Sequence, residues 1–343
     1  MKLTMRDIAA QAKVSPATVS NALNGRPGVS DSVKEHILTI AREMGYQSAR
    51  EAGKSNRYVR LIIYRSHGIV VADTPFFSEL IESIQSECHQ EGLELMISHV
   101  HAQEDSDFEA QIHAFCNEKC AGIILLATEM SPEELGRFTD LRSPMVVLDN
   151  SFASENVHSV VMNNWEAGYL AAKELLSAGH RDIGHITSSV AFRNNSERTA
   201  GFRAGLAEAG LELPEERIFP VLPAMNGAYE DMKRLIAERG GRLPGAFFAG
   251  NDWMAIGSMR AIKEAGYRVP EDVSIVGMDD TAICEACTPQ LTTVHVYRRE
   301  LGMTVIRTLL SVIHQGTPCA IKTTVGVKIV PRGSVKNLRA RGD

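Results

Sequence analysis

Three short segments within the first 45 residues each combine a helix start signal with apolar residues at helical spacing. Thr4 is placed to cap the first segment, in which apolar residues recur at i, i+3, i+4 and i+7. Ser15 is placed to cap the second, with Pro16 at the first helical position, where a missing N–H leaves no bond unmade. Ser30 begins the third, and Gly45 supplies a stop signal. Three short helices that share one core are typical of an all-α helix-turn-helix domain.

The second segment has a small, polar outer face, formed by Ala17, Thr18 and Asn21, with the shape needed to enter a major groove. The alternative is a small helical bundle with no role on DNA. Charge favours DNA, because residues 1–60 hold ten Lys and Arg against five Asp and Glu, a net charge of +5. The whole chain carries −6, which leaves −11 for the remaining 283 residues. A basic head on an acidic body is expected when only the head contacts phosphate.

The run TMRDIAAQAKVSPATVSNALNG resembles the N-terminal domain of LacI/GalR-type transcription regulators. The resemblance continues through nearly all 343 residues, in phrases such as TPFFSELIESI, NNWEAGYLAAKELLSAGHRDIGHIT and AGNDWMAIGSMRAIKEAGYRVPEDVSIVGMDD. It implies a sequence-specific DNA-binding regulator, a repressor by the habit of the family, whose operator affinity is controlled by a bound small molecule.

Independently of that resemblance, the rest of the chain alternates short apolar runs with helical patterns. The runs have the length of buried parallel strands and are LIIY (61–64), GIILLA (122–127), MVVLDN (145–150), DIGHIT (182–187), GAFFAG (245–250) and VSIVGMDD (273–280). The helical patterns cover 77–90, 107–117, 166–178, 197–209, 252–264 and 299–314. Such alternation predicts an α/β fold with doubly wound parallel sheets.

The predicted division is a helix-turn-helix domain at 1–46, a linker at 47–60 and an effector-binding and dimerisation domain at 61–335. About 280 residues exceed one comfortable core, which predicts two lobes. The resemblance implies a periplasmic-binding-protein-like architecture, with a ligand in the cleft at the carboxyl ends of the strands. It places the crossings between lobes near Val161, near Leu291 to Val294 and near Pro318 to Lys322. One lobe then holds about 61–161 plus 293–318, and the other about 162–291 plus 321–333.

The resemblance places the specificity positions of the recognition helix at Pro16, Ala17 and Asn21. Asn21 can bond adenine N6 and N7 bidentately, whereas Ala17 offers only apolar contact, for instance to a thymine methyl. Thr18, Ser20 and Asn24 are expected to contact phosphates or to hold the fold. The predicted DNA-contacting residues are Thr4, Ser15, Pro16, Ala17, Thr18, Ser20, Asn21, Asn24, Arg50, Lys54 and Arg57.

The linker QSAREAGKSNRYVR, residues 47–60, is basic and poor in apolar anchors. In the family, this stretch becomes a hinge helix whose leucine wedges into the minor groove. This chain departs from that pattern, because no leucine occurs between Ile40 and Leu61. We therefore favour an ordinary tether with phosphate contacts from Arg and Lys over a wedge that kinks the central base step.

The predicted effector-binding residues are Phe76, Phe77, Asp149, Arg198, Asn251 and Asp279. The resemblance puts an aromatic at the cleft wall, where a ring can stack on a sugar face, and one phenylalanine of the pair is expected to be ordinary core. The polar residues follow strands or begin helices, so they should converge on one cleft. Charge balance favours a neutral hydroxylated ligand, a sugar or sugar derivative, over a carboxylate bound by the arginine. Asp252 and Asp280 are expected only to cap helices.

Patterns that would indicate an enzyme or a metal site are incomplete. Gly53-Lys54-Ser55 looks like the end of a phosphate loop, but Ser48 stands where its first glycine should be and no strand precedes it. Cys284-x-x-Cys287 has metal or redox spacing without a second pair or a flanking histidine. We therefore expect no catalytic activity, no cofactor and no metal.

The chain has no signal-peptide pattern and no apolar run of about 18 residues, so we expect a cytoplasmic protein without a membrane segment. The expected partners are double-stranded DNA with a palindromic operator, a small-molecule effector and a second copy of the chain, because a symmetric pair reads a palindrome. The alternative is a sugar-binding module of transport or chemotaxis type, and the missing signal pattern argues against it. Effector identity, and whether the effector releases or tightens DNA binding, do not follow from the sequence.

Overall fold

The computed structural model describes residues 5–23, 29–43, 58–71, 75–103, 106–138, 140–315 and 319–339. The chain forms two compact units. The first consists mainly of the N-terminal residues up to Tyr58, and the second holds almost all of the rest.

The first unit contains three helices, α1 (Met5–Ala12), α2 (Pro16–Leu23) and α3 (Asp31–Glu43). The Oγ atom of Ser15 accepts a hydrogen bond from the Thr18 amide at 3.1 Å, which caps α2 as its sequence predicts. One apolar core joins the three helices and confirms the predicted stripes where they are described: Ile8, Ala9, Ala12, Val19, Ala22, Ile37, Ile40 and Ala41. Met44 and Gly45 lie outside the described residues.

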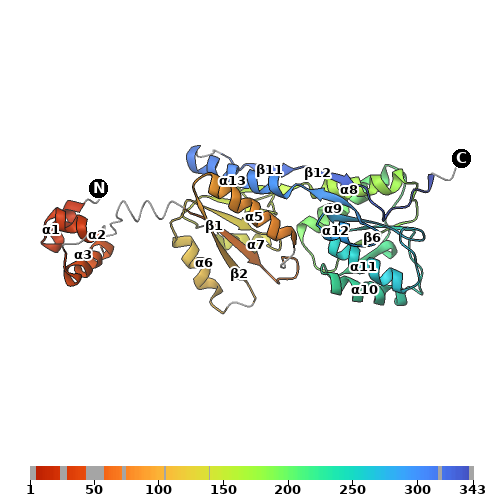
Figure 1. The fold of residues 1–343 in the computed structure, drawn as a ribbon, viewed down its shortest axis with the longest axis horizontal. Helices are drawn as coiled ribbons and strands as arrows, with labels where there is room; N and C mark the ends of the chain where they lie inside the picture. Colours follow the sequence, from red (N-terminus) through yellow and green to blue (C-terminus); the bar gives the residue numbers. More distant parts are fainter. Residues whose placement is uncertain are drawn as a thin grey trace. The chain divides into compact units, whose positions relative to one another are not determined.

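The second unit contains two six-stranded sheets, which Figure 1 shows as two lobes. The first sheet has the order β11-β5-β4-β3-β1-β2, and the second has the order β12-β10-β9-β8-β6-β7. The strands of the first lobe are β1 (Tyr58–Arg65), β2 (Glu94–His101), β3 (Gly122–Leu126), β4 (Met145–Leu148), β5 (His158–Met162) and β11 (Lys322–Val325). Those of the second are β6 (Ile183–Ser188), β7 (Ile218–Val221), β8 (Ala246–Ala249), β9 (Ser274–Asp279), β10 (Thr292–Val296) and β12 (Val327–Val330).

Helices cover both sheets, as expected of a doubly wound fold. In the first lobe α13 packs against α5, and in the second α8 packs against α9 and α10 against α11 (Figure 1). Their bounds are α5 (Pro75–Gln90), α6 (Phe108–Asn117), α7 (Pro132–Leu135), α8 (Asn164–Ser177), α9 (Arg193–Ala207), α10 (Met225–Glu238), α11 (Asp252–Glu264), α12 (Ile283–Ala286) and α13 (Arg298–Gln315). Short 3-10 turns lie at Gly136–Phe138 and Glu215–Arg217.

The continuous apolar runs of the sequence form the central strands. All five residues of β3 are buried, and the strand pairs in parallel with β1 and β4, which sets Ile124 opposite Leu61 and Val146. Both faces of such a strand are covered, so its residues need no alternation. The pair formed by β10 and β12 is antiparallel.

The chain crosses between lobes at positions that differ from those expected. It leaves β5 for α8 at Asn163, close to the expected Val161. β10 still belongs to the second sheet, so the next crossing follows Val296 instead of lying at Leu291 to Val294. β11 belongs to the first sheet, which moves the last crossing to Gly326, beyond the expected Pro318 to Lys322.

The predicted linker ends earlier than 60, because β1 begins at Tyr58. Arg60, counted above as a linker charge, is a buried strand residue that forms an ion pair with Glu118. Its guanidinium also donates to Ser98 Oγ at 2.5 Å. Arg60 is therefore committed to the fold of the first lobe.

Two glycines bring the backbones of α8 and α9 into direct contact. A Cβ on Gly168 would lie 1.9 Å from the Arg198 carbonyl oxygen, and one on Gly201 would lie 1.8 Å from that of Trp165. Only residues without a side chain fit at this crossing, which fixes α9 and therefore Arg198.

Gly168→Ala is expected to destabilise the second lobe by more than about 2 kcal/mol, because overpacking against backbone cannot relax by a rotamer change. Gly136→Ala is the matched control, since a Cβ there meets nothing within 4 Å. Urea denaturation should show a lower midpoint for the first variant only. Equal midpoints for both would contradict the close approach.

Candidate effector site and DNA-binding face

The six residues predicted to bind an effector all line one cavity between the two lobes. The space in it that water can reach is about 40 Å³, and its volume is about 510 Å³ when the open mouth is included. Phe76, Phe77 and Asp149 come from the first lobe, while Arg198, Asn251 and Asp279 come from the second. Both sheets turn strand ends toward this cavity, where ligands of parallel α/β sheets bind.

The aromatic pair forms one wall. Phe76 and Phe77 are both buried at the start of α5, with ring centroids 5.1 Å apart in edge-to-face geometry. Both line the cavity, so neither is confined to the core as was expected of one of them.

Asp149 follows β4 in the left-handed backbone region, with φ of 62°, which turns its carboxylate into the cleft. Thr128 Oγ1 donates to its Oδ2 at 2.7 Å, and Asn194 Nδ2 of α9 donates to Oδ1 at 3.0 Å. Burial raises the pKa of Asp149 to about 6, although Thr128, Arg198 and Asn194 lower it. Asn194 therefore links the second lobe to the first across the cleft.

Arg198 is buried in the second turn of α9, one turn further into the helix than its sequence suggested, because α9 begins at Arg193. Its Nε donates to Asn164 Oδ1 at 2.9 Å and its Nη1 to the Gly250 carbonyl at 2.6 Å. No carboxylate takes a hydrogen bond from it among the described residues, so its charge acts on Asp279 and Asp149 through space.

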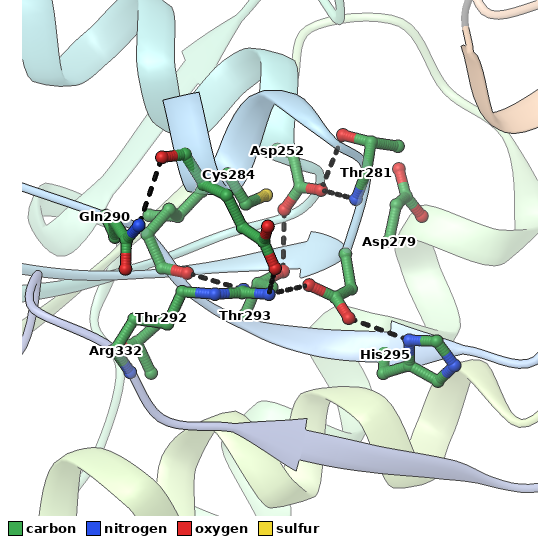
Figure 2. Close-up of polar contacts among 12 residues, drawn as sticks. Asp252, Asp279, Thr281, Cys284, Gln290, Thr292, Thr293, His295 and Arg332 are labelled. Atoms are coloured by element: carbon green, nitrogen blue, oxygen red, sulfur yellow. Dashed lines mark hydrogen bonds and ion pairs between the residues drawn. The ribbon is translucent and has the colours of Figure 1, made fainter. Parts of the chain in front are cut away.

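Asp279 ends β9 with φ of 113°, and its carbonyl accepts a hydrogen bond from Arg298 Nη1. Its carboxylate has no hydrogen-bond partner among the described residues, and Figure 2 shows it apart from the bonded network. Burial raises the pKa of Asp279, against the lowering by Arg198. A desolvated acceptor thus faces the cavity.

Asn251 and Trp253 open α11 at the cavity. Asn251 Oδ1 accepts the Met254 amide at 2.7 Å as the helix N-cap, which fixes the side chain with its amide nitrogen available for a ligand. The indole Nε1 of Trp253 is buried and has no partner among the described residues. Trp253 also lines the cavity, so an unsatisfied donor belongs to a residue of its wall.

Asp252 and Asp280 have structural roles, but neither caps a helix as expected. Asp252 is fully buried and accepts the Thr281 amide at 2.9 Å, the Thr281 hydroxyl at 3.0 Å and the Thr293 hydroxyl at 2.6 Å (Figure 2). Asp280 binds His295 Nδ1 and Arg332 Nη2, at 2.8 and 2.7 Å. These bonds hold the loop after β9 and so the backbone that carries Asp279.

The Cys284-x-x-Cys287 pair lies beside this network. Burial raises the pKa of both thiols, and Cys287 Sγ donates to the Pro289 carbonyl at 3.2 Å. Within the described ranges, no group of three or more His, Cys, Asp or Glu could hold a metal ion.

Several cavity residues escaped prediction. Asn194 stands one helical turn before Arg198, a spacing that could have revealed it, whereas Trp253 resembles a core residue of an amphipathic helix. The lining residues that were not predicted are Val70, Thr128, Met162, Phe192, Asn194, Pro223, Trp253 and Thr281.

The predicted DNA-binding face can be described in part. Pro16 and Ala17 are exposed, and Ser20 and Asn21 are half-buried. The Ser15 and Thr18 hydroxyls lie 2.8 Å apart and are used in the cap of α2, so these two residues hold the fold. Five predicted contacts lie outside the described residues: Thr4, Asn24, Arg50, Lys54 and Arg57.

Comparison with known proteins agrees with both parts of the chain. Residues 4–48 match the model of bacterial regulatory proteins of the lacI family, and residues 172–335 match a periplasmic binding protein-like domain. An HTH-type transcriptional repressor PurR from Mannheimia succiniciproducens is 30% identical over 341 residues, covering 98% of this chain and 99% of that relative. The chain belongs to the LacI family.

Solved structures of LacI-family proteins show the same fold. A complex of the regulator CelR with cellobiose matches with a TM-score of 0.72 at 23% identity, over 97% of this chain and 100% of that one. A ribose-bound LacI-family regulator from Enterococcus faecium matches at 25% identity with a TM-score of 0.68, over 82% of this chain and 100% of that one. The curated relatives carry the names of repressors, which are not enzymes. No helix in the described part of this LacI-family chain is long and apolar enough to span a membrane.

Proposed function

We propose that this LacI-family protein is a transcriptional repressor whose operator affinity is controlled by a neutral hydroxylated molecule, a sugar or sugar derivative, bound in the cleft. The observation that carries the proposal is the pairing of an unused acceptor, Asp279, with an unused donor, Trp253 Nε1, in one aromatic-walled cavity. The proposed effector contacts are these two residues with Phe76, Phe77 and Arg198.

The chemistry of the cavity favours hydroxyl groups. A hydroxyl donates and accepts, so one ligand can satisfy both the carboxylate and the indole N–H. A ligand carboxylate is disfavoured, because Arg198 already uses two donors on Asn164 and Gly250 and its charge faces two carboxylates. Two solved structures that this chain resembles contain bound cellobiose and bound ribose, which are molecules of this class.

The proposed mechanism is a change in lobe arrangement. A ligand shifts an equilibrium only by its differential affinity for two states. The Asp149–Asn194 hydrogen bond already joins the two lobes without a ligand. An effector that contacts both Phe76 and Asp279 adds further contacts across the cleft and so stabilises this arrangement of the lobes. We propose that this change is transmitted through a homodimer that reads a palindromic operator with its two α2 helices.

The effector is identified by thermal shift with pentoses, hexoses, disaccharides, nucleosides and small acids. A ligand that binds only the folded protein raises its apparent stability. The chain has two tryptophans, and Trp165 is exposed, so Trp165→Phe leaves Trp253 as a fluorescent reporter inside the cleft. A hit should change Trp253 emission. Stabilisation by small acids, without any response to sugars or nucleosides, would contradict the proposed ligand class.

Asn21→Ala tests the proposed base contact of α2. We expect a loss of about 1–3 kcal/mol of operator affinity that is confined to half-sites with adenine at one position, because a bidentate amide contact discriminates by that amount. Fluorescence anisotropy on a half-site series with each base at each position measures it. Gln11→Ala, at an exposed position of α1 outside the predicted DNA contacts, is the control and should leave the base preference unchanged. An equal loss for every base would show that Asn21 does not read sequence.

A further inference from the structure

The segment that follows β1, residues 66–71, is fixed by one buried carboxylate. Glu129, which follows β3, has a side chain with 0% exposure. Its Oε2 accepts the amides of His67 and Gly68 at 3.0 and 2.9 Å, and its Oε1 accepts those of Val70 and Val71, both at 2.8 Å. Four backbone donors of one short segment thus converge on a single side chain.

The Glu129 carboxylate is held in its charged form. Burial alone would raise its pKa, but the amide bonds from Val71, His67 and Gly68 outweigh burial and keep the pKa of Glu129 below its ordinary value. Hydrogen bonds to an ionised acceptor are stronger than bonds between neutral groups. The carboxylate therefore remains a strong acceptor for all four amides at neutral pH.

A second carboxylate holds the start of the same segment. Tyr64 Oη and Ser66 Oγ each donate to Glu134 Oε1 at 2.8 Å, while Glu134 Oε2 accepts the Ser131 amide at 2.7 Å. Glu134 also belongs to the capping box of α7. Residues 66 to 71 are thus tied to the residues after β3 through both Glu129 and Glu134.

This segment contributes a wall of the cleft. Val70 lines the same cavity as Phe76 and Trp253, and the next residue, Val71, is 1% exposed in the core. Glu129 is not among the cavity-lining residues. It therefore makes no direct contact with a ligand in this cavity, and it acts on the wall through the backbone that it holds.

We infer that Glu129 is a positioning residue of the effector site, whose carboxylate fixes residues 66–71 as one wall of the cleft. Through Val70 it sets the apolar contact that this wall makes with an effector. The consequence for effector binding rests on the proposed function, whereas the position of the wall does not. The test is therefore made first without effector or DNA.

Amide hydrogen exchange directly measures the four hydrogen bonds that Glu129 accepts, which we call the Glu129 clamp. In the wild type, the amides of residues 67, 68, 70 and 71 should be protected. Glu129→Gln should lower their protection at least tenfold while leaving β3 unchanged, because a glutamine amide offers one acceptor oxygen and turns an NH₂ group toward two donors. Glu133→Gln, a neighbouring exposed position, is the matched control and should change nothing. Unchanged protection in Glu129→Gln would overturn the inference.

Acrylamide quenching of Trp253 fluorescence measures how well the wall formed by residues 66–71 shields the cleft. In the Trp165→Phe background, Glu129→Gln should raise the quenching constant of Trp253 about twofold or more, and Glu133→Gln should not. Val70→Ala shortens only a side chain and leaves the four amide bonds to Glu129 in place. It therefore tests the wall even if Glu129→Gln does not fold. It should raise quenching with exchange at residues 67 and 68 unchanged, and quenching equal to that of the wild type would overturn the inference.

The link to ligands is measured with the same variants. The probes are ribose and cellobiose, followed by Trp253 emission, and a probe that binds the wild type should bind Val70→Ala and Glu129→Gln at least threefold more weakly. If neither probe binds while exchange and quenching change as expected, the proposed ligand class is wrong and the positioning role of Glu129 stands. If a probe binds all three proteins equally, the role of Glu129 at the effector site is refuted.

Discussion

Asp279→Asn is expected to weaken effector binding about 10- to 100-fold and, at the same time, to stabilise the folded protein at neutral pH. The loss follows because a bond to a charged group contributes roughly 1.5–3 kcal/mol, and about 1.4 kcal/mol is a factor of ten. The gain follows because the carboxylate is desolvated without a hydrogen-bond partner among the described residues, and its attraction to Arg198 does not outweigh that penalty. A single substitution should thus separate stability from function.

The sign of the pH dependence follows from the raised pKa of Asp279. The folded state binds its proton more tightly than the unfolded chain, so this group's stabilising contribution is complete below the ordinary Asp pKa of about 4. It is lost as pH rises through the folded pKa. Asp149, whose pKa is raised to about 6, acts in the same direction between about pH 4 and 6.

Thermal denaturation between pH 4 and 8 measures both effects. Asp279→Asn should decline less with rising pH than the wild type and should melt about 2 °C or more higher at pH 7.5, given roughly 2–4 °C for each kcal/mol in a large domain. Asp140→Asn, at an exposed position of the first lobe, should follow the wild type. Parallel curves for Asp279→Asn and the wild type would show that the carboxylate is not desolvated.

Ala17→Glu is expected to weaken operator binding roughly 100-fold, because placing like charges together at an interface opposes binding by several kcal/mol. Ala17 is exposed at the start of α2 and makes no core contact, so the fold of the first unit should be retained. The loss should be greatest at low salt, where phosphate repulsion is screened least.

Ala110→Glu is the matched control for this charge change. It makes the same substitution at an exposed position of α6 in the second unit. Gel shifts at two salt concentrations should show wild-type affinity for the control and loss for Ala17→Glu. Equal affinity of both variants would mean that α2 does not face DNA.

The fold was predictable where one kind of signal dominated. α11 occupies Asp252–Glu264, the range expected from its pattern. It begins there because the Asn251 side chain caps the helix by accepting the Met254 amide. β3 and β9 are continuous apolar runs buried on both faces. These features depend on residues close together in the sequence.

The strands that were missed lack such signals. β11 is Lys322–Val325, with a burial pattern that alternates between exposed and half-buried. β2 is an edge strand in which Met96 and Ile97 are exposed, so its apolar residues do not mark one buried face. Their place depends on pairing with β5 and β1, which local sequence does not encode. Because β11 was not predicted, the last lobe crossing was misplaced.

The site was predictable in its strand-end residues and not in its supporting bonds. Asp149 follows β4 and Asp279 ends β9, and the parallel strands of each sheet end at the edge that faces the cavity. The role of Glu129 could not be predicted, because all four of its amide donors belong to backbone whose conformation follows only from the fold. The indole N–H of Trp253 could not be predicted as an available donor, because only the structure shows that it has no hydrogen-bond partner among the described residues.

The central claim is that occupancy of the cleft controls affinity for DNA. The direct test is fluorescence anisotropy of an operator fragment titrated with the full-length protein, with and without the ligand that gives the largest thermal shift, in wild type and Asp279→Asn. The account predicts at least a fivefold change in operator affinity on addition of ligand to the wild type, in the range of typical coupling energies, and a greatly reduced change in the variant. Operator affinity that is unaffected by a ligand shown to bind beside Trp253 would contradict it.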